Sequence, residues 1–86
     1  MHEISRFHGI RVTMSYDDHN PPHFYAEYGE QKAIIGISNA DVLHGSLPPQ
    51  QLQLVFAWCI IYKYELMGNW RLGKKKQAMN KIKPLI

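Results

Sequence analysis

Two short alternating segments meet at Gly29-Glu30, and together they predict a β-hairpin over residues 23–37. Glycine at the first of two central turn positions suits a tight type II′ turn. A two-residue turn also fixes the register, and it sets Glu27 opposite Lys32 on one face. The other face then carries only small and apolar side chains, namely Phe24, Ala26, Ala33 and Ile35. Because the register separates charged from apolar pairs, we expect the second face to pack on a core.

The remaining pattern predicts an α+β fold. Residues 10–16 alternate between apolar and polar side chains, which predicts a half-buried strand, and Val42-Leu43 adds a short fourth strand. The expected architecture is a small antiparallel sheet of three to four strands packed on one long apolar helix followed by a shorter helix. With 86 residues, the chain forms one domain over residues 1–86. Its parts are a strand-rich segment 1–44, a helical segment 47–80 and a basic C-terminal tail 71–86.

The long helix is expected to begin near Leu47, with Ser46 as its cap and two prolines in its first turn. Gly68 is expected to end or kink it. One face should enter the core, and we expect these residues to be buried together: Phe24, Ile35, Val55, Phe56, Cys59 and Ile60. A second apolar face is a candidate interface with another chain, and it consists of Leu54, Trp58, Ile61 and Tyr62.

The composition excludes several classes of protein. An apolar share of 45% argues against disorder, and no apolar run approaches the roughly 18 residues that a membrane span needs. The first residues lack the pattern of a signal peptide, and a single cysteine agrees with a reducing compartment. We therefore expect a cytoplasmic protein that does not associate with membranes.

Charge is divided unequally along the chain. Residues 1–43 hold three cations and six acids, whereas residues 44–86 hold seven cations against Glu65 alone. Six of these cations follow one another without an acid and are candidates for binding nucleic acid: Arg71, Lys74, Lys75, Lys76, Lys81 and Lys83. Such a run attracts nucleic acid or an acidic partner, and the alternative is a solvated tail near a helix C-terminus.

Residues 17–25 carry most of the chemistry, because they combine carboxylates, imidazoles and a phenol around a Pro-Pro pair. The candidate catalytic residues are Asp18, His19, His23 and Tyr25. An imidazole titrates near neutrality, and Asp17 or Asp18 could orient it as an acid or base. An extended Pro-Pro path of about 3.1 Å per residue separates the two histidine Cα atoms by up to about 12 Å, near the limit of joint coordination. We therefore expect no metal and no cofactor, and a purely structural loop remains the alternative.

Short elements along nearly the whole chain occur in a characteristic order: Ile4-Ser5-Arg6-Phe7-His8-Gly9-Ile10, Asp18-His19-Asn20-Pro21-Pro22-His23-Phe24, Tyr28-Gly29, Gly45-Ser46-Leu47-Pro48, Glu65-Leu66, Asn69-Trp70 and Lys81-Ile82-Lys83-Pro84-Leu85. This order resembles a bacterial family, the domain-of-unknown-function family DUF4160. Members of that family usually carry a further histidine where Tyr25 stands here. The resemblance implies a small α+β protein that acts with a partner, often a member of a second small family, DUF2442.

Two functions follow as hypotheses. The first is a protein-interaction module, one half of a toxin–antitoxin-like or regulatory pair, which binds a DUF2442-like partner or a second copy of itself. The alternative is a small RNA-binding or RNA-cleaving protein that uses the basic run and the loop histidines. The sequence leaves open whether the protein is an enzyme.

Overall fold

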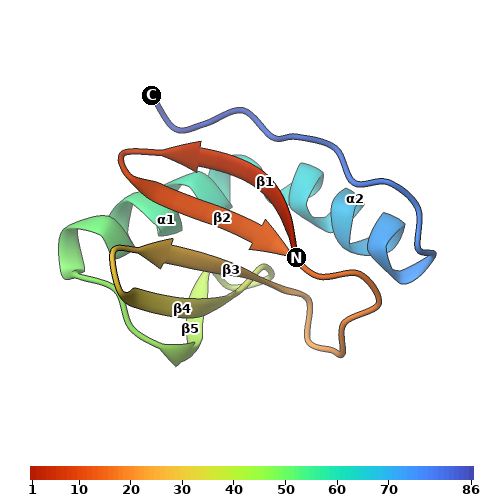
Figure 1. Ribbon diagram of the computed structural model, residues 1–86, viewed down its shortest axis with the longest axis horizontal. Helices are drawn as coiled ribbons and strands as arrows, with labels where there is room; N and C mark the ends of the chain where they lie inside the picture. Colours follow the sequence, from red (N-terminus) through yellow and green to blue (C-terminus); the bar gives the residue numbers. More distant parts are fainter.

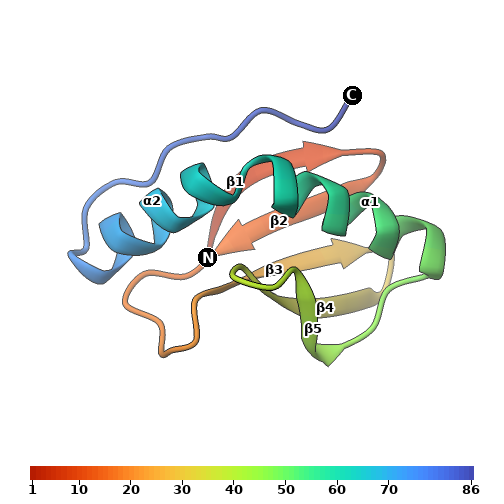
Figure 2. The same cartoon turned by 180° about the vertical axis from the view of Figure 1, so that it is seen from behind.

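A five-stranded antiparallel sheet lies against two consecutive helices, and the computed structural model describes all 86 residues (Figure 1). The strands are β1 (His2–Phe7), β2 (Ile10–Met14), β3 (His23–Tyr28), β4 (Gln31–Gly36) and β5 (Asp41–Gly45), and the helices are α1 (Pro49–Ile61) and α2 (Lys63–Lys74). Strand order in the sheet follows the sequence. Figure 2 shows both helices crossing one face of the sheet. The α+β class is confirmed, with five strands instead of three or four.

The central hairpin confirms the register expected from the sequence. All six predicted pairs of β3 and β4 are present, from His23 opposite Gly36 to Tyr28 opposite Gln31. Gly29 adopts a positive φ of 60° in the turn. The predicted core face is fully buried, and it carries Phe24, Ala26, Ala33 and Ile35. The strand expected over residues 10–16 ends earlier, at Met14, because the chain turns away toward α2.

Strand β1 was not expected, and its sequence explains why. It pairs with β2 across a tight turn at His8-Gly9, where both residues have positive φ. The register shifts between Glu3 and Ser5, so Ile4 and Ser5 are both buried although they are adjacent. A bulge of this kind interrupts the period of two on which strand prediction depends.

The two helices are similar in length, with 13 and 12 residues, so the expectation of one long helix followed by a shorter one is wrong in its proportions. Pro48 occupies the cap position of α1 and Ser46 makes no capping bond. The chain leaves the helical conformation at Tyr62, and α2 continues through Gly68, which neither ends nor kinks it. An unbroken helix over both segments would be about 39 Å long, more than the 34 Å longest dimension of the protein. Neither helix is long and apolar enough to cross a membrane.

Trp58 lies at the centre of the core, so its predicted place on an outer helix face is wrong. Its ring centroid lies 5.3 Å from that of Phe7 and 5.6 Å from that of Phe24. The indole Nε1–H donates to the carbonyl oxygen of Lys83 at 2.8 Å, so the ring is fully buried without an unpaired polar atom. The core of both layers is therefore arranged around one side chain.

The buried stripe of α1 differs from the predicted one. Val55, Trp58 and Cys59 are buried, whereas Phe56 is only half-buried and Ile60 is exposed. Phe24 and Ile35 of the sheet are buried as expected. Because α1 is apolar on nearly every side, its periodicity could not indicate which face enters the core.

Residues 77–86 form an extended strap beside β1 and the helices, where the sequence suggested a helix up to residue 80 and a solvated tail (Figure 2). The amide side chain of Asn69 exchanges two 2.8 Å hydrogen bonds with the backbone of Asn80. Farther along, the N–H of Ile82 donates to the carbonyl of Ile4 at 2.8 Å. Met79 and Ile82 are buried, so the strap completes the core.

The sheet face away from the helices carries ion pairs. Glu3 lies 2.9 Å from both Arg6 and Arg11, and Glu27 lies 3.7 Å from Arg11 and 3.5 Å from Lys32. Hydrogen bonds from Arg6 and Arg11 lower the pKa of Glu3 to about 2. These pairs neutralise much of the acidic first half of the chain.

Replacing the central indole tests this description of the core. Trp58→Ala should lower the free energy of unfolding by about 3–5 kcal/mol, because it leaves a large cavity. Urea denaturation measures the loss. The control Ile60→Ala, an exposed position on the same helix, should cost no more than about 0.5 kcal/mol. Equal losses in the two variants would contradict the assignment of the buried face.

Candidate functional site

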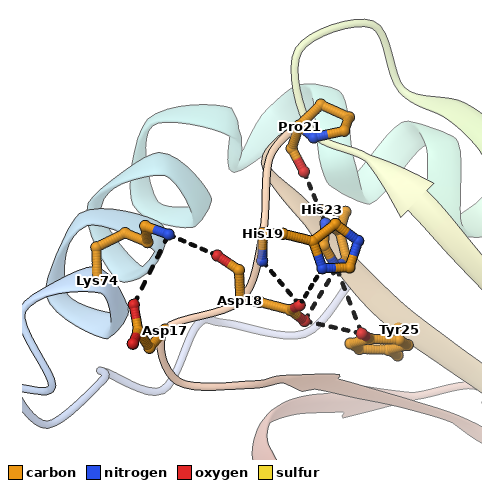
Figure 3. Close-up of polar contacts among 7 residues, drawn as sticks. All are labelled: Asp17, Asp18, His19, Pro21, His23, Tyr25 and Lys74. Atoms are coloured by element: carbon orange, nitrogen blue, oxygen red, sulfur yellow. Dashed lines mark hydrogen bonds and ion pairs between the residues drawn. The ribbon is translucent and has the colours of Figure 1, made fainter.

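The loop between β2 and β3 lies against the C-terminal end of α2, and this contact positions the candidate site (Figure 3). The N–H of Asp17 donates to the carbonyl of Gly73 at 3.0 Å. Lys74 Nζ donates to the backbone carbonyl of Asp18 at 2.7 Å and lies 3.8 Å from the Asp17 carboxylate. The histidine loop and the start of the basic run, 56 positions apart at this contact, therefore form one surface.

The carboxylate of Asp18 is the hub of the site, and its side chain is only 14% exposed. Oδ2 accepts a 2.8 Å hydrogen bond from the Tyr25 hydroxyl and lies 3.1 Å from His23 Nε2. Oδ1 accepts the backbone N–H of His19 at 2.9 Å and lies 3.0 Å from the Nδ1 of the same residue. The other three residues predicted as catalytic candidates, His19, His23 and Tyr25, are therefore gathered around the carboxylate of the fourth, as Figure 3 shows.

His23 is enclosed by the protein. Its side chain is 4% exposed, and Nδ1 donates to the carbonyl of Pro21 at 2.7 Å. The ring packs between Tyr25 and Trp70, with centroid separations of 5.4 and 5.3 Å. Both ring nitrogens thus face partners within the chain, and His23 has no open position for an external ligand.

His19 has the opposite environment. Its side chain is 86% exposed, and Nδ1 is held against Asp18. Nε2 has no partner in the protein. The ring centroids of His19 and His23 are 5.6 Å apart, because both imidazoles turn toward the same carboxylate. The Asn20–Pro21 peptide bond within this loop is cis.

The protonation of Asp18 and Tyr25 follows from these contacts. Burial opposes ionisation of Asp18, but hydrogen bonds from Tyr25 and the His19 backbone, together with His23, outweigh it and lower the pKa of Asp18. Burial and the hydrogen bond to Asp18 both raise the pKa of Tyr25. At neutral pH the site therefore contains a carboxylate and a protonated phenol.

No group of three or more histidine, cysteine, aspartate or glutamate side chains is arranged to hold a metal ion. Tyr25, which occupies the position of a further histidine in the resemblance noted above, directs its hydroxyl to Asp18. The chemistry that the cluster can perform with its own groups is proton transfer.

The predicted basic residues are all exposed, but they differ in what they contact. Lys74 supports the histidine loop, its Nζ also lies 5.8 Å from the centre of the Trp70 ring, and Lys81 Nζ donates to the carbonyl of Glu3 at 2.8 Å. Lys75 and Lys76 follow in the turn that ends α2. No local pattern in the sequence indicates that Lys74 contacts the loop, because the contact is long-range.

The predicted helix interface is only partly exposed. Of its four residues, Ile61 is 59% exposed, Leu54 and Tyr62 are half-buried, and Trp58 belongs to the core. An apolar surface that shares only Ile61 with the predicted interface surrounds the junction of the two helices, and we call it the junction patch. It consists of Ile60, Ile61 and Tyr64, with exposed fractions of 67%, 59% and 86%. Sequence analysis missed Ile60 because it assigned that residue to the core.

The model of a family described as a domain of unknown function (DUF4160) matches residues 9–71. This span is more than half of the chain, so the protein belongs to the DUF4160 family. The matched span includes the complete histidine loop and both helices up to Arg71. Comparisons with curated proteins and with solved structures gave no match.

Removal of the hub carboxylate should destabilise the protein. Asp18→Ala removes the carboxylate oxygen that the hydroxyl of Tyr25 and Nε2 of His23 share, and leaves these two atoms only their longer 3.3 Å contact with each other. The loss should cost about 1–3 kcal/mol in chemical denaturation at pH 7. The control Glu30→Ala removes an exposed turn carboxylate and should cost less than about 0.5 kcal/mol.

The same measurement has a pH dependence of known sign. A lowered pKa means that folding favours ionised Asp18, so its contribution is present above the ordinary carboxyl value and is lost as the pH falls through the lowered value. The difference between the wild-type protein and Asp18→Ala should therefore shrink below about pH 4. A difference that grows toward acid pH would contradict the hydrogen bonding described here.

Proposed function

We propose that the protein is an interaction module that acts with a partner protein, as one half of a toxin–antitoxin-like or regulatory pair. The observation that carries this proposal is the junction patch, in which three large apolar side chains are more than half exposed. A soluble protein rarely exposes such side chains together unless they contact another molecule.

The composition of α1 supports a protein as the partner. The helix contains no charged residue over its 13 positions, and its exposed face continues from the junction patch through uncharged side chains, namely Gln50, Gln53 and Ala57. Depletion of charge and enrichment in aromatic residues characterise the cores of protein–protein interfaces. A nucleic acid would need cations on this face. We therefore propose an apolar protein surface as the ligand, and a DUF2442-like protein as the first candidate to test.

Charge introduced into the patch should abolish the association. Ile60→Glu should weaken binding of the partner at least tenfold, because it buries an unpaired carboxylate in the interface. Pull-down with the product of the neighbouring gene, followed by titration calorimetry, measures the effect.

Ile86→Glu is the matched control, since it makes the same exchange at an exposed residue far along the chain and should change affinity less than twofold. Light scattering of the isolated protein identifies the case in which the partner is a second copy. A monomer whose partner binds both variants equally would refute the patch as the interface.

The second candidate function is RNA binding, and one contact favours it. Lys74 joins the basic end of α2 to the histidine loop, so cations and imidazoles share a surface. Lys75 and Lys76 extend the positive charge into the next turn, and both are exposed. Phosphate oxygens are the natural ligands of such cations, and imidazoles beside them could transfer protons.

Neutralising exposed cations near this surface tests the second candidate. The double variant Arg71→Gln/Lys75→Gln should weaken binding of single-stranded RNA irrespective of sequence, and each lost phosphate contact should reduce the salt slope by about 0.7. Fluorescence anisotropy at several salt concentrations measures both quantities. Lys63→Gln, at the other end of α2, is the control and should leave the slope unchanged. If none of these changes alters the affinity for RNA, the basic surface is not the RNA-binding site.

A further inference from the structure

The two loop histidines have different environments, which the sequence alone cannot distinguish. His23 is 4% exposed and both of its ring nitrogens have partners, whereas His19 is 86% exposed and only Nδ1 has one. A carboxylate on Nδ1 fixes the tautomer of a neutral imidazole and leaves the lone pair on Nε2. His19 therefore has the arrangement of an acid–base group, and His23 helps to hold the carboxylate that orients it.

The surrounding side chains restrict the reaction that such a group could serve. The hydroxyl of Tyr25 is hydrogen-bonded to Asp18, and burial and that bond keep it protonated, so it is a poor nucleophile. Cys59 is buried in the core, where burial raises the pKa of its thiol to about 11. Since the site offers proton transfer and a cation but no nucleophilic side chain, the nucleophile must come from the substrate or from water.

We propose that His19 is the acid–base residue of a site that cleaves single-stranded RNA, and that Asp18 is its positioning residue. RNA carries its own nucleophile, because the ribose 2′-hydroxyl lies beside the scissile phosphodiester. Nε2 of His19 takes the 2′-hydroxyl proton, the 2′-oxygen bonds to phosphorus, and the bond from phosphorus to the 5′-oxygen breaks. The leaving oxygen takes a proton from water, and His19 returns its proton to solvent. The products are a 2′,3′-cyclic phosphate and a 5′-hydroxyl, with no co-reactant.

This inference rests on the second candidate function, since RNA must first bind the basic surface. The contact of Lys74 agrees with this inference. Its ammonium is bonded to the backbone of Asp18, the residue that orients His19, and so lies close to the site where a phosphate would bind. General acid–base catalysis contributes about 10²- to 10⁴-fold to a rate. An open imidazole of this kind should also be replaceable by a small molecule from solution.

The test uses the full-length protein and an end-labelled single-stranded RNA, with a second oligonucleotide that carries one 2′-deoxyribose at the main cleavage position. His19→Ala should lower the cleavage rate about 100-fold or more while RNA affinity stays within twofold, and free imidazole should restore part of the rate. His44→Ala, at another exposed histidine, is the control and should cleave at the wild-type rate. Asp18→Asn should also lower the cleavage rate. Free imidazole should restore less of the rate in this variant than in His19→Ala, since the imidazole of His19 is still present.

Each failure has a separate meaning. If the wild-type protein binds RNA but does not cleave it, or if His19→Ala cleaves at the wild-type rate, the assignment of His19 is overturned and RNA binding stands. If the wild-type protein does not bind RNA, both are overturned. Cleavage of the 2′-deoxy position would show water as the nucleophile and contradict the proposed step. Rate loss in His19→Ala without imidazole rescue, accompanied by a lowered melting temperature, would show that the residue is structural.

Discussion

Asp18 holds three parts of the chain together at one end of the sheet, two of them through its carboxylate and one through its backbone carbonyl. The carboxylate oxygens bind the start of β3 through His23 and Tyr25, and they bind the loop itself through His19. The backbone carbonyl of the same residue binds Lys74 at the end of α2. A nearly buried carboxylate is costly unless several donors surround it, so its position fixes theirs. The enclosed and the open histidine, and the neighbouring cations, all follow from this arrangement.

The second surface has its origin in the core. Trp58 occupies the space between the sheet and the strap, and the helix breaks at Tyr62 so that α2 can also pack on the sheet. The break leaves Ile60 and Ile61 on the outside, although neither has a polar atom in its side chain. The junction patch lies where α1 meets the start of α2, whereas the histidine site lies on the loop between β2 and β3 at the other end of α2. The two proposed functions therefore concern different residues and can be tested separately.

The sequence predicted those features that depend on local spacing. The register of the β3–β4 hairpin and the choice of Asp18, His19, His23 and Tyr25 both came from short-range patterns. Prediction from the sequence failed for features that depend on contacts between distant parts of the chain. A bulge beside Ile4 concealed β1, the uniformly apolar α1 concealed the true position of Trp58, and the contact of Lys74 with the loop joins residues 56 positions apart. The roles of the two histidines depend on burial, which no local pattern records.

The measurement that most directly tests the account is a double-mutant cycle between Asp18 and Tyr25. Asp18→Ala, Tyr25→Phe and the combined variant would be unfolded in urea beside the wild-type protein. A charged hydrogen bond at 2.8 Å predicts a coupling free energy of about 1–3 kcal/mol. The sum of the losses in unfolding free energy of the two single variants should exceed the loss of the double variant by this amount. Losses that add to within about 0.3 kcal/mol would show that the two groups do not interact, and the carboxylate would not be the hub of the site.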